Sequence, residues 1–315
     1  MIGMPGKSHE GSLPPLSEVQ RSLAASLKRD VVVLAEEIGL RDCFSPKLLE
    51  ASLRHLERRF QGIGLKPLRE TFQAGGVDFA NLSAEIRGTG PEVVVVGAHY
   101  DAVHGCPAAN DNASGVAAML ALAERAVRWT PERTLRFVAF ANEEPPHFQT
   151  DGMGSRVCAR NCKARGEKVA AMLSLETMGY YSDQQGSQAY PPPLSFFYPS
   201  KGDFIAFVGN FGSRALVKQC IARFRKDAAF PSEGAALPGF LPGVGWSDHW
   251  SFWEEGYPAV MVTDTAPFRY PHYHQPTDTP DKLDYDRFAR VVDGLVPVVA
   301  ELVGASAPSS SGSGP

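Results

Sequence analysis

The stretch VVVVGAHYD, residues 93–101, decides the fold class of this chain. Its four consecutive valines lack the apolar and polar alternation of a half-exposed strand, and such runs are typical of strands buried on both faces. FVAFANEE, residues 137–144, has the same form, an apolar run that ends in polar and charged residues. Together with similar runs, these stretches predict strands at residues 81–86, 93–98, 135–141, 170–175, 205–208 and 259–263.

Helical patterns lie between several of these strands. Apolar residues recur at helical spacing, and the expected helices cover residues 16–38, 46–61, 114–128, 214–224 and 285–303. Gly39, after the first of them, suits a C-terminal cap. Strands that alternate with helices predict a sheet covered by helices on both faces. We therefore expect an α/β fold, a single three-layer domain whose mixed sheet is mostly parallel.

The predicted domain covers residues 15–303. Residues 1–14 are rich in Gly, Pro and Ser and predict an extended arm, and the Ser/Gly-rich residues 304–315 predict a disordered tail. No apolar run is long enough to predict a membrane span, and the first residues lack the apolar core of a secretory signal. The compartment and the oligomeric state stay open at this point.

The charge and the cysteines exclude several classes of protein. The chain has 31 Lys and Arg against 35 Asp and Glu, and its basic residues are scattered, which argues against a nucleic-acid partner. Five cysteines, an odd number without a CxxC pair, argue against a disulfide framework and a zinc ribbon. They are Cys43, Cys106, Cys158, Cys162 and Cys220.

Side chains that can bind a metal follow four of the predicted strands. His99 and Asp101 follow the predicted strand at 93–98, and Glu143 and Glu144 follow the one at 135–141. Glu176 follows the strand at 170–175, and residues 272–274 come after the strand at 259–263 and a loop. In open α/β sheets, ligands bind outside the carboxyl ends of the strands. Taken singly, each group has a structural explanation, as a hydrogen-bonded histidine or a solvated pair at a turn. Several carboxylates that converge on one edge of a sheet, however, need a cation between them.

Six segments in series resemble one enzyme family. They are GAHYDAVHGCPAANDNASGVAAML (97–120), FANEEPP (140–146), GMGSRVCA (152–159), LSLETMGYY (173–181), SDHWSFWEEGYPAV (247–260) and HYHQPTDTPDKLDY (272–285). In this order they are similar to the zinc exopeptidases that include bacterial leucyl aminopeptidases, aminopeptidase Y and the related glutaminyl cyclases. The resemblance covers roughly residues 80–300 and implies a metallo-aminopeptidase, a hydrolase that releases N-terminal residues from peptides.

The resemblance also implies a role for each site residue. Asp111 would bridge two zinc ions, although in PAANDNASG it could also cap the helix that begins near Ser114. One ion would be held by His99 with Glu144, the other by Glu176 with His274, and Mn²⁺ or Co²⁺ could replace Zn²⁺.

The same resemblance assigns the catalytic residues. Asp101 would orient the His99 ring, and Glu143 would take a proton from water and deliver it to the leaving amine. The free α-amine of the peptide would lie among the carboxylates near Glu176. Relatives carry a cis peptide after the bridging aspartate, so we expect one between Asp111 and Asn112.

Two positions depart from the family pattern. Glu176 stands where many relatives have Asp, which leaves the metal spacing and the binding of the amine open. Gly243–Trp246 lacks the tyrosine that stabilises the oxyanion in some relatives, and Tyr270, Tyr273 and His272 are candidates for its role.

Three other functions remain as alternatives. A glutaminyl cyclase, an acyltransferase, can hold a single zinc ion with the same ligands. A carboxypeptidase is possible if Arg269 receives the terminal carboxylate. A non-catalytic binding domain with a decayed site is disfavoured by the intact ligands and by Glu143.

The remaining histidines and aromatic residues have structural interpretations. Ser247-Asp248-His249 is not read as a catalytic triad, because adjacent side chains point in different directions. We expect Ser247 to cap a helix and Asp248 to support the metal ligands. The expectations for the other residues are a core position for Trp250, Phe252 and Trp253, no ligand role for His104, His147 and His249, and a surface position for His9 and His55.

Overall fold

The computed structural model describes residues 3–305 and forms one α/β domain around an eight-stranded sheet. The strands are β1 (Leu68–Ala74), β2 (Val77–Ile86), β3 (Glu92–His99), β4 (Thr134–Phe140), β5 (Lys168–Glu176), β6 (Ile205–Gly209), β7 (Ser232–Ala236) and β8 (Ala259–Thr263). Their order is β1-β2-β4-β3-β5-β8-β6-β7. The central strands β4, β3, β5 and β8 are parallel, and antiparallel pairs occur on both sides of them. The predicted mixed, mostly parallel sheet is confirmed.

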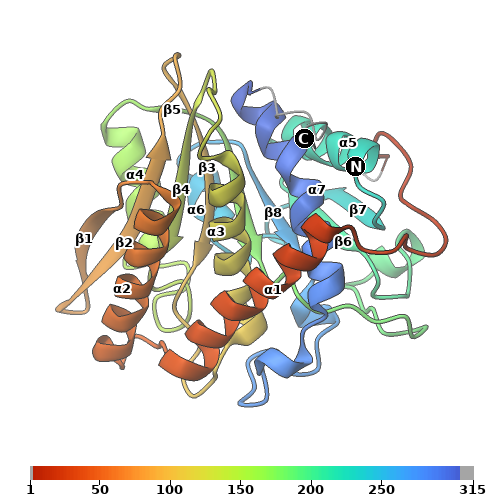
Figure 1. The fold of residues 1–315 in the computed structure, drawn as a ribbon, viewed down its shortest axis with the longest axis horizontal. Coiled ribbons are helices and arrows are strands. Elements are labelled where there is room, and N and C mark those ends of the chain that lie inside the picture. The colour runs from red at the N-terminus through yellow and green to blue at the C-terminus, as the bar shows by residue number, and fades with distance from the viewer. Residues whose placement is uncertain (1–2, 306–315) are drawn as a thin grey trace, which may run out of the picture.

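Helices cover both faces of the sheet. They are α1 (Glu18–Val32), which continues as the π-helical turn η1 (Val33–Ile38), α2 (Pro46–Ile63), α3 (Gly115–Ala126), α4 (Gly154–Ala164), α5 (Arg214–Asp227), α6 (His249–Glu254) and α7 (Tyr285–Val303). Figure 1 shows α1, α3 and α7 crossing in front of the sheet. Shorter turns are η2 (Ala109–Ser114), η3 (Leu194–Phe196), η4 (Ala266–Phe268) and η5 (Pro280–Lys282).

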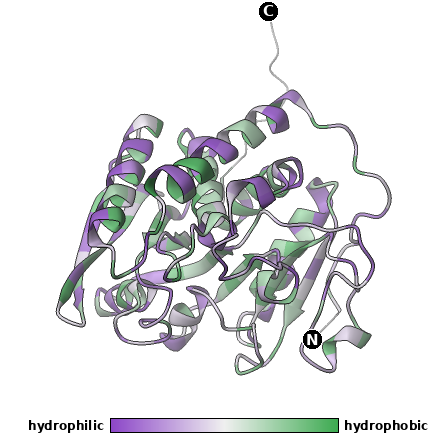
Figure 2. Ribbon diagram, turned by 90° about the horizontal axis from the view of Figure 1, so that it is seen from below, coloured by the Kyte–Doolittle hydropathy of each residue, from purple (hydrophilic) through white to green (hydrophobic). Residues whose placement is uncertain are grey.

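The valine run of β3 is buried on both sides, as predicted. Val94 and Val96 belong to the larger core, which α1, α2, α3, α5 and α7 cover, whereas Val93 and Val95 pack with residues of α4 and α6. In Figure 2 most strands are green, and the helices carry alternating bands of purple and green, as expected of amphipathic helices. The expected core residue Phe252 is fully buried in the second of these cores, and Trp253 packs against it.

Two strands were missed by the sequence patterns, and both lie at an edge of the sheet. β1 (LRETFQA) is partly exposed on both faces, so its composition shows no buried run. β7 (SEGAA) consists of small residues and one glutamate, without the β-branched or aromatic side chains that favour strands. The pairing of β1 with β2 and of β7 with β6 therefore depends on the rest of the fold.

Two local predictions were wrong. His55 is buried, with only 9% of its surface exposed, because it packs inward from α2 with Nε2 3.5 Å from Asp30 Oδ1 of α1. Ser247 does not cap α6: the residue before this helix is Asp248, and the Ser247 hydroxyl donates to Glu176 instead. The five cysteines are all free, and Cys158 and Cys162 lie buried on α4.

The predicted arm at residues 1–14 is described from residue 3 onward. Residues 3–14 have no helix or strand. This segment contacts α5 through Arg225 Nη1, which donates to Pro5 O (3.2 Å), and β7 through Ser232 N, which donates to Ser8 Oγ (2.9 Å). The expected tail is described only at Gly304 and Ala305, and the rest of it lies outside the described residues. Within residues 3–305, no helix has the length and apolar character needed to cross a bilayer.

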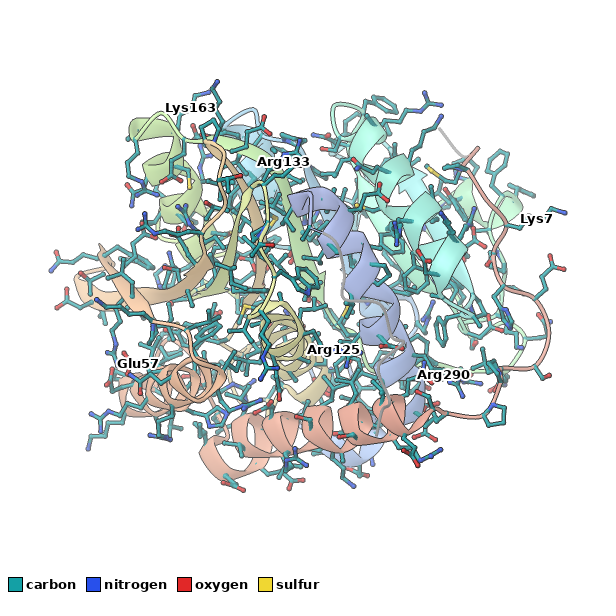
Figure 3. The ribbon with its side chains drawn as sticks, turned by 45° about the horizontal axis from the view of Figure 1, so that its top comes forward. Lys7, Glu57, Arg125, Arg133, Lys163 and Arg290 are labelled. Atoms are coloured by element: carbon teal, nitrogen blue, oxygen red, sulfur yellow. The ribbon has the colours of Figure 1, made fainter. Side chains whose placement is uncertain are left out.

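Charged side chains extend from the outside of the domain. Glu57 of α2, Arg125 of α3, Lys163 of α4 and Arg133, which precedes β4, are labelled in Figure 3 and lie apart from one another. Several are neutralised locally, for example Arg133 by Glu92 at 2.6 Å. The charge that is concentrated inside the domain lies elsewhere, at the carboxyl edge of the central strands.

Candidate metal centre

The five predicted ligands are carried to one edge of the sheet by five separate parts of the chain. His99 is the last residue of β3 and Glu176 the last residue of β5, and these strands are parallel neighbours. Glu144 follows β4, and His274 lies in the segment after β8. Asp111 lies in η2, which leads into α3. This convergence at the carboxyl edge is the arrangement expected from the strand order.

The side chains form two groups that share Asp111. His99, Asp111 and Glu176 offer ligand atoms within 4.8 Å of one another, and so do Asp111, Glu144 and His274. Asp111 Oδ1 lies 3.2 Å from His99 Nε2, and Asp111 Oδ2 lies 3.0 Å from His274 Nε2. The two oxygens of one carboxylate therefore face the histidines of different groups.

This grouping corrects the predicted pairing of ligands. His99 Nε2 lies 3.4 Å from Glu176 Oε2, and His274 Nε2 lies 3.3 Å from Glu144 Oε1. His99 therefore shares its group with Glu176 and not with Glu144. The reason is the order of the strands: β3 has β4 on one side and β5 on the other, and the His99 ring faces the end of β5.

Unpaired polar atoms show that the residues fit a metal. His99 Nε2, Asp111 Oδ1 and Glu144 Oε1 are buried and have no hydrogen-bond partner among the described residues. Buried nitrogen and oxygen atoms are rarely left in this state. Ligand atoms around a tetrahedral ion with bonds of about 2 Å are about 3.3 Å apart, close to the separations found here. Two imidazoles and three carboxylates are ligands of the type that zinc accepts.

Asp101 holds the two glutamates and His99 in place. Its Oδ1 accepts the backbone N–H of Glu143 and its Oδ2 that of Glu144, both at 3.1 Å. Its Oδ1 also lies 3.4 Å from His99 Nδ1, on the side of the ring away from Asp111. One buried carboxylate thus links the end of β3 to the turn after β4.

Glu143 lies beside the group that contains His99. Its Oε2 is 3.8 Å from His99 Nε2, and its side chain belongs to neither group of ligands. Burial raises the pKa of Glu143 well above its ordinary value, against the attraction of His99, and the charge of Glu144 adds to the effect. The position and the raised pKa suit a side chain that accepts and returns a proton.

The other titratable groups show how strongly the carboxylates depend on positive charge. Burial, followed by the charge of Asp111, raises the pKa of Glu144 to about 7. Against burial, contacts with Asp111 and Glu144 raise the pKa of His274 to about 10. Against burial as well, contacts with His274 and His99 lower the pKa of Asp111. The acidic site therefore needs positive charge. Either its two histidines are protonated, or a bound cation supplies the charge and the histidines are neutral.

Backbone geometry is unusual around these residues. The peptide between Asp111 and Asn112 is cis, as predicted from the resemblance. Within residues 3–305, six non-glycine residues have a positive φ; His274 is one of them, Thr177 follows Glu176, and Asn142 precedes Glu143. Such conformations cost of order 1–3 kcal/mol each and cluster at functional sites.

Several supporting residues were missed by the sequence analysis. Asp278 accepts the backbone N–H groups of Asn110 and Asp111 at 2.9 and 3.1 Å. Asp278 could have been found from the sequence, because it lies four residues after His274 in one of the segments that resemble the family. Ser247 donates to Glu176 Oε2 at 2.6 Å. This bond fixes the glutamate side chain, which is longer than the aspartate that many relatives have at this position.

Arg41 holds the segment between His99 and Asp111. It is fully buried, and its guanidinium donates to the carbonyl groups of Tyr100 (3.0 Å), Pro107 (2.8 Å) and Ala108 (3.0 Å). Burial lowers its pKa to about 10. Nothing in the pattern around Arg41 indicated this role, because the contacts join positions about 60 residues apart.

The three candidates for the oxyanion role differ in their surroundings. The Tyr270 hydroxyl donates to Asp278 at 2.8 Å, and His272 Nδ1 lies 2.8 Å from the Thr277 hydroxyl at the surface. The ring of Tyr273 stacks on His274 with centroids 3.9 Å apart, and Tyr273 lines the same pocket as Glu176. Among the three, Tyr273 is the one that faces the ligand groups.

Other expected residues are also placed. His104, His147 and His249 belong to neither group of ligands. Arg269 is buried, and its guanidinium donates to Gln188 Oε1 (2.7 Å) and to the carbonyl group of Phe204 (2.8 Å). Its Nη2 has no hydrogen-bond partner among the described residues, and Arg269 is not among those that line the pocket beside Glu176.

Comparison with known proteins assigns the family. The model described as "Peptidase family M28" matches residues 81–299, more than half of the chain. The chain belongs to peptidase family M28. The matched range contains all five residues of the two ligand groups.

Relatives of this M28 chain include proteins with and without a known activity. It is 36% identical over 279 residues to the uncharacterized protein YfbL of Escherichia coli (strain K12), covering 86% of this chain and 85% of the relative. It is 28% identical to leucine aminopeptidase 1 of Trichophyton rubrum, covering 70% of this chain and 57% of that protein's length. This chain thus spans little more than half of the fungal enzyme.

Solved structures share the fold of this M28 chain. A zinc aminopeptidase from Bacillus subtilis has a TM-score of 0.70 at 15% identity, covering 92% of this chain and 96% of that one. A glutaminyl cyclase from Fimbriiglobus ruber has a TM-score of 0.66 at 22% identity, covering 92% and 97%. The expected α/β architecture of the zinc exopeptidases is therefore confirmed for the M28 chain.

Proposed function

We propose that this M28 chain is an aminopeptidase that hydrolyses the first peptide bond of peptides with a free N-terminus, using two divalent metal ions. The observation that carries the proposal is the sharing of Asp111, whose two oxygens face His99 and His274 of different ligand groups. The family assignment and the leucine aminopeptidases among the relatives support it.

In this proposal Asp111 would offer one oxygen to each of the two sets of ligands. His99 and Glu176 complete one set of ligands, and Glu144 and His274 complete the other. Zinc suits this mixture of imidazole and carboxylate ligands, and manganese and cobalt are the expected substitutes. When bound, such ions act as Lewis acids that activate water and polarise a carbonyl group.

Residues of the chain would carry out proton transfer, binding of the substrate amine and stabilisation of the negative oxygen. Glu143 accepts a proton from the attacking water and delivers it to the leaving amine, because its carboxylate lies beside His99 without belonging to either group. Glu176 and its neighbours attract the positively charged α-amine of the peptide. Tyr273, for whose hydroxyl the described residues offer no hydrogen-bond partner, donates to the oxygen that becomes negative.

The test combines metal analysis with one substitution. Glu143→Gln keeps the shape of the side chain and removes the base, so we expect unchanged metal content and a fall in kcat of about 10²–10⁴-fold on leucyl p-nitroanilide. Glu144→Gln, the matched comparison at the adjacent position, should reduce metal content, and added zinc should partly restore its activity. Loss of metal in Glu143→Gln instead would exchange the roles of the two glutamates.

The substrate panel separates the alternatives. We expect hydrolysis of amino-acid p-nitroanilides and of peptides with a free N-terminus, and no hydrolysis of N-blocked peptides, since the free amine is part of the recognition. Cyclisation of N-terminal glutaminyl peptides without hydrolysis of the other substrates would show a glutaminyl cyclase and refute the proposal.

A further inference from the structure

A largely apolar pocket adjoins the candidate metal centre. It lies on the face of the sheet away from α5 and α7, over β8, β6 and β7, and it has a volume of about 780 Å³ including its open mouth. Glu176 and Tyr273 line its near end. The apolar residues of its wall include Val208, Leu237, Val244, Met261 and Phe268.

One carboxylate interrupts this apolar wall. Glu233 of β7 lies in the same cross-strand row as the predicted ligand Glu176: Glu176 pairs with Thr263, Thr263 with Ala206, and Ala206 with Glu233. Neighbouring strands are about 4.8 Å apart, so three steps place Glu233 about 14 Å along the sheet from Glu176. Glu176 and Glu233 are therefore at opposite ends of one pocket. Among the described residues that line it, no Lys or Arg is present.

In the described part of the chain, the Glu233 carboxylate has one long ion pair and no hydrogen bond. Its nearest cation, Arg225 Nη2, is 3.8 Å away. Arg225 is itself committed to backbone and hydroxyl oxygens: Nη2 donates to Ser232 O (2.7 Å) and Nε to Ser232 Oγ (3.2 Å). Burial raises the pKa of Glu233, against the attraction of Arg225. The carboxylate thus retains acceptor capacity toward the pocket.

Two aromatic rings accompany Glu233 at this end. Tyr190 and Tyr198 line the pocket, and their rings stack with centroids 5.7 Å apart. Their hydroxyl groups donate to backbone carbonyls, Tyr190 to Pro199 O (2.7 Å) and Tyr198 to Gly234 O (3.0 Å), which fixes the rings. Aromatic faces next to a carboxylate form an environment that favours an organic cation.

We propose that Glu233 is a specificity-determining residue, which selects peptides whose N-terminal residue is arginine or lysine. The inference rests on the proposed aminopeptidase function and names its substrate class. The aliphatic stem of such a side chain packs along the apolar wall, and its charged end reaches Glu233 beside the tyrosine rings. Shorter apolar residues fill only the near part of the pocket and remain substrates of lower kcat/KM.

The first test uses the unaltered protein with its metals in place. Arginyl and citrullyl p-nitroanilides have nearly the same shape and differ in charge, so the ratio of their kcat/KM values isolates the charge. We expect a ratio of at least about 10, the effect of one hydrogen bond to a charged group. A ratio close to 1, with methionyl p-nitroanilide hydrolysed normally, would overturn this inference and leave the proposed function intact. Hydrolysis of none of the three substrates would refute the proposed function itself.

The second test assigns the effect to Glu233. In Glu233→Gln the arginyl-to-citrullyl ratio should fall by about 10–100-fold, while kcat/KM for methionyl p-nitroanilide stays within about threefold. Glu254→Gln, which removes an equal charge from an exposed position on α6, is the control and should leave the ratio unchanged. An unchanged ratio in Glu233→Gln would overturn the assignment. If this variant does not fold, the comparison of arginyl and citrullyl substrates in the unaltered protein still decides whether the pocket selects charge.

Discussion

At the scale of single residues, Asp101 shows how a side chain outside the ligand set controls it. Its two oxygens accept the backbone N–H groups of Glu143 and Glu144 and approach the His99 ring, so three groups of the site depend on one carboxylate. Residues that orient metal ligands in this way typically affect metal affinity by 10–100-fold. An uncharged amide cannot replace it, because its NH₂ group would face a backbone donor.

We therefore predict that Asp101→Asn lowers metal affinity by about 10–100-fold and that excess zinc restores part of the activity. The measurement is a titration with zinc followed by activity, alongside metal content after dialysis. Asp286→Asn, an exposed position at the start of α7, serves as the control. Wild-type zinc affinity in Asp101→Asn would show that the geometry of the ligands does not depend on this carboxylate.

At the scale of elements, the start of α6 depends on a histidine that must stay neutral. His249 is fully buried, its Nε2 donates to Val244 O at 2.8 Å, and its Nδ1 is buried without a partner among the described residues. Protonation would place an unpaired charged N–H in this environment. Burial accordingly lowers the pKa of His249 to about 4. The contact joins α6 to Val244, which lines the pocket.

This pKa predicts a loss of stability in acid. The folded-state pKa lies below the ordinary value of 6.5, so the unfolded chain takes up the proton first as the pH falls. The contribution of neutral His249 to the free energy of unfolding is fully present above pH 6.5. It is lost as the pH falls toward 4, and the full loss is roughly 3 kcal/mol. We expect His249→Gln to flatten the pH dependence of the free energy of unfolding between pH 7 and 4, measured by urea denaturation. An equally steep dependence in the variant would assign the acid sensitivity to other groups.

At the scale of the whole molecule, the candidate metal centre ties together parts of the chain that are distant in sequence. Its ligands come from the ends of β3 and β5, from η2, and from the segments after β4 and β8. Buried carboxylates held this close repel one another unless cations lie between them. Any ion that binds the folded chain alone stabilises it by mass action, by about 2.7 kcal/mol when its concentration is 100 times its Kd.

Removal of the metals should therefore destabilise the entire domain. We predict that a chelator lowers the unfolding temperature by at least about 5 °C. Zinc, cobalt or manganese should reverse the change, whereas magnesium, which prefers oxygen ligands alone, should not. The measurement is calorimetry with metal content determined in parallel. An unchanged unfolding temperature in metal-free protein would contradict a structural contribution of the ions.

The sequence by itself determined most of the elements and the identity of the candidate ligands. Helix α7 begins and ends where its apolar spacing predicts, and the runs of β3 and β4 identified the buried centre of the sheet. This was possible because the period of a helix or strand and the burial of one face determine where apolar residues occur in the local sequence. The candidate ligands were visible because buried histidines and carboxylates at strand ends are costly unless they are paired or bind a cation.

Only the tertiary structure decided which residues meet. The grouping of His99 with Glu176, the inward position of His55 and the place of Glu233 in the pocket all follow from strand order and helix packing. β7, which carries Glu233, has no local strand signal, because its small residues are held by pairing with β6. Local patterns record whether a residue is buried, but its partner is set by contacts between distant segments. The physical reason is that these contacts are satisfied together, when the whole sheet and both helix layers have formed.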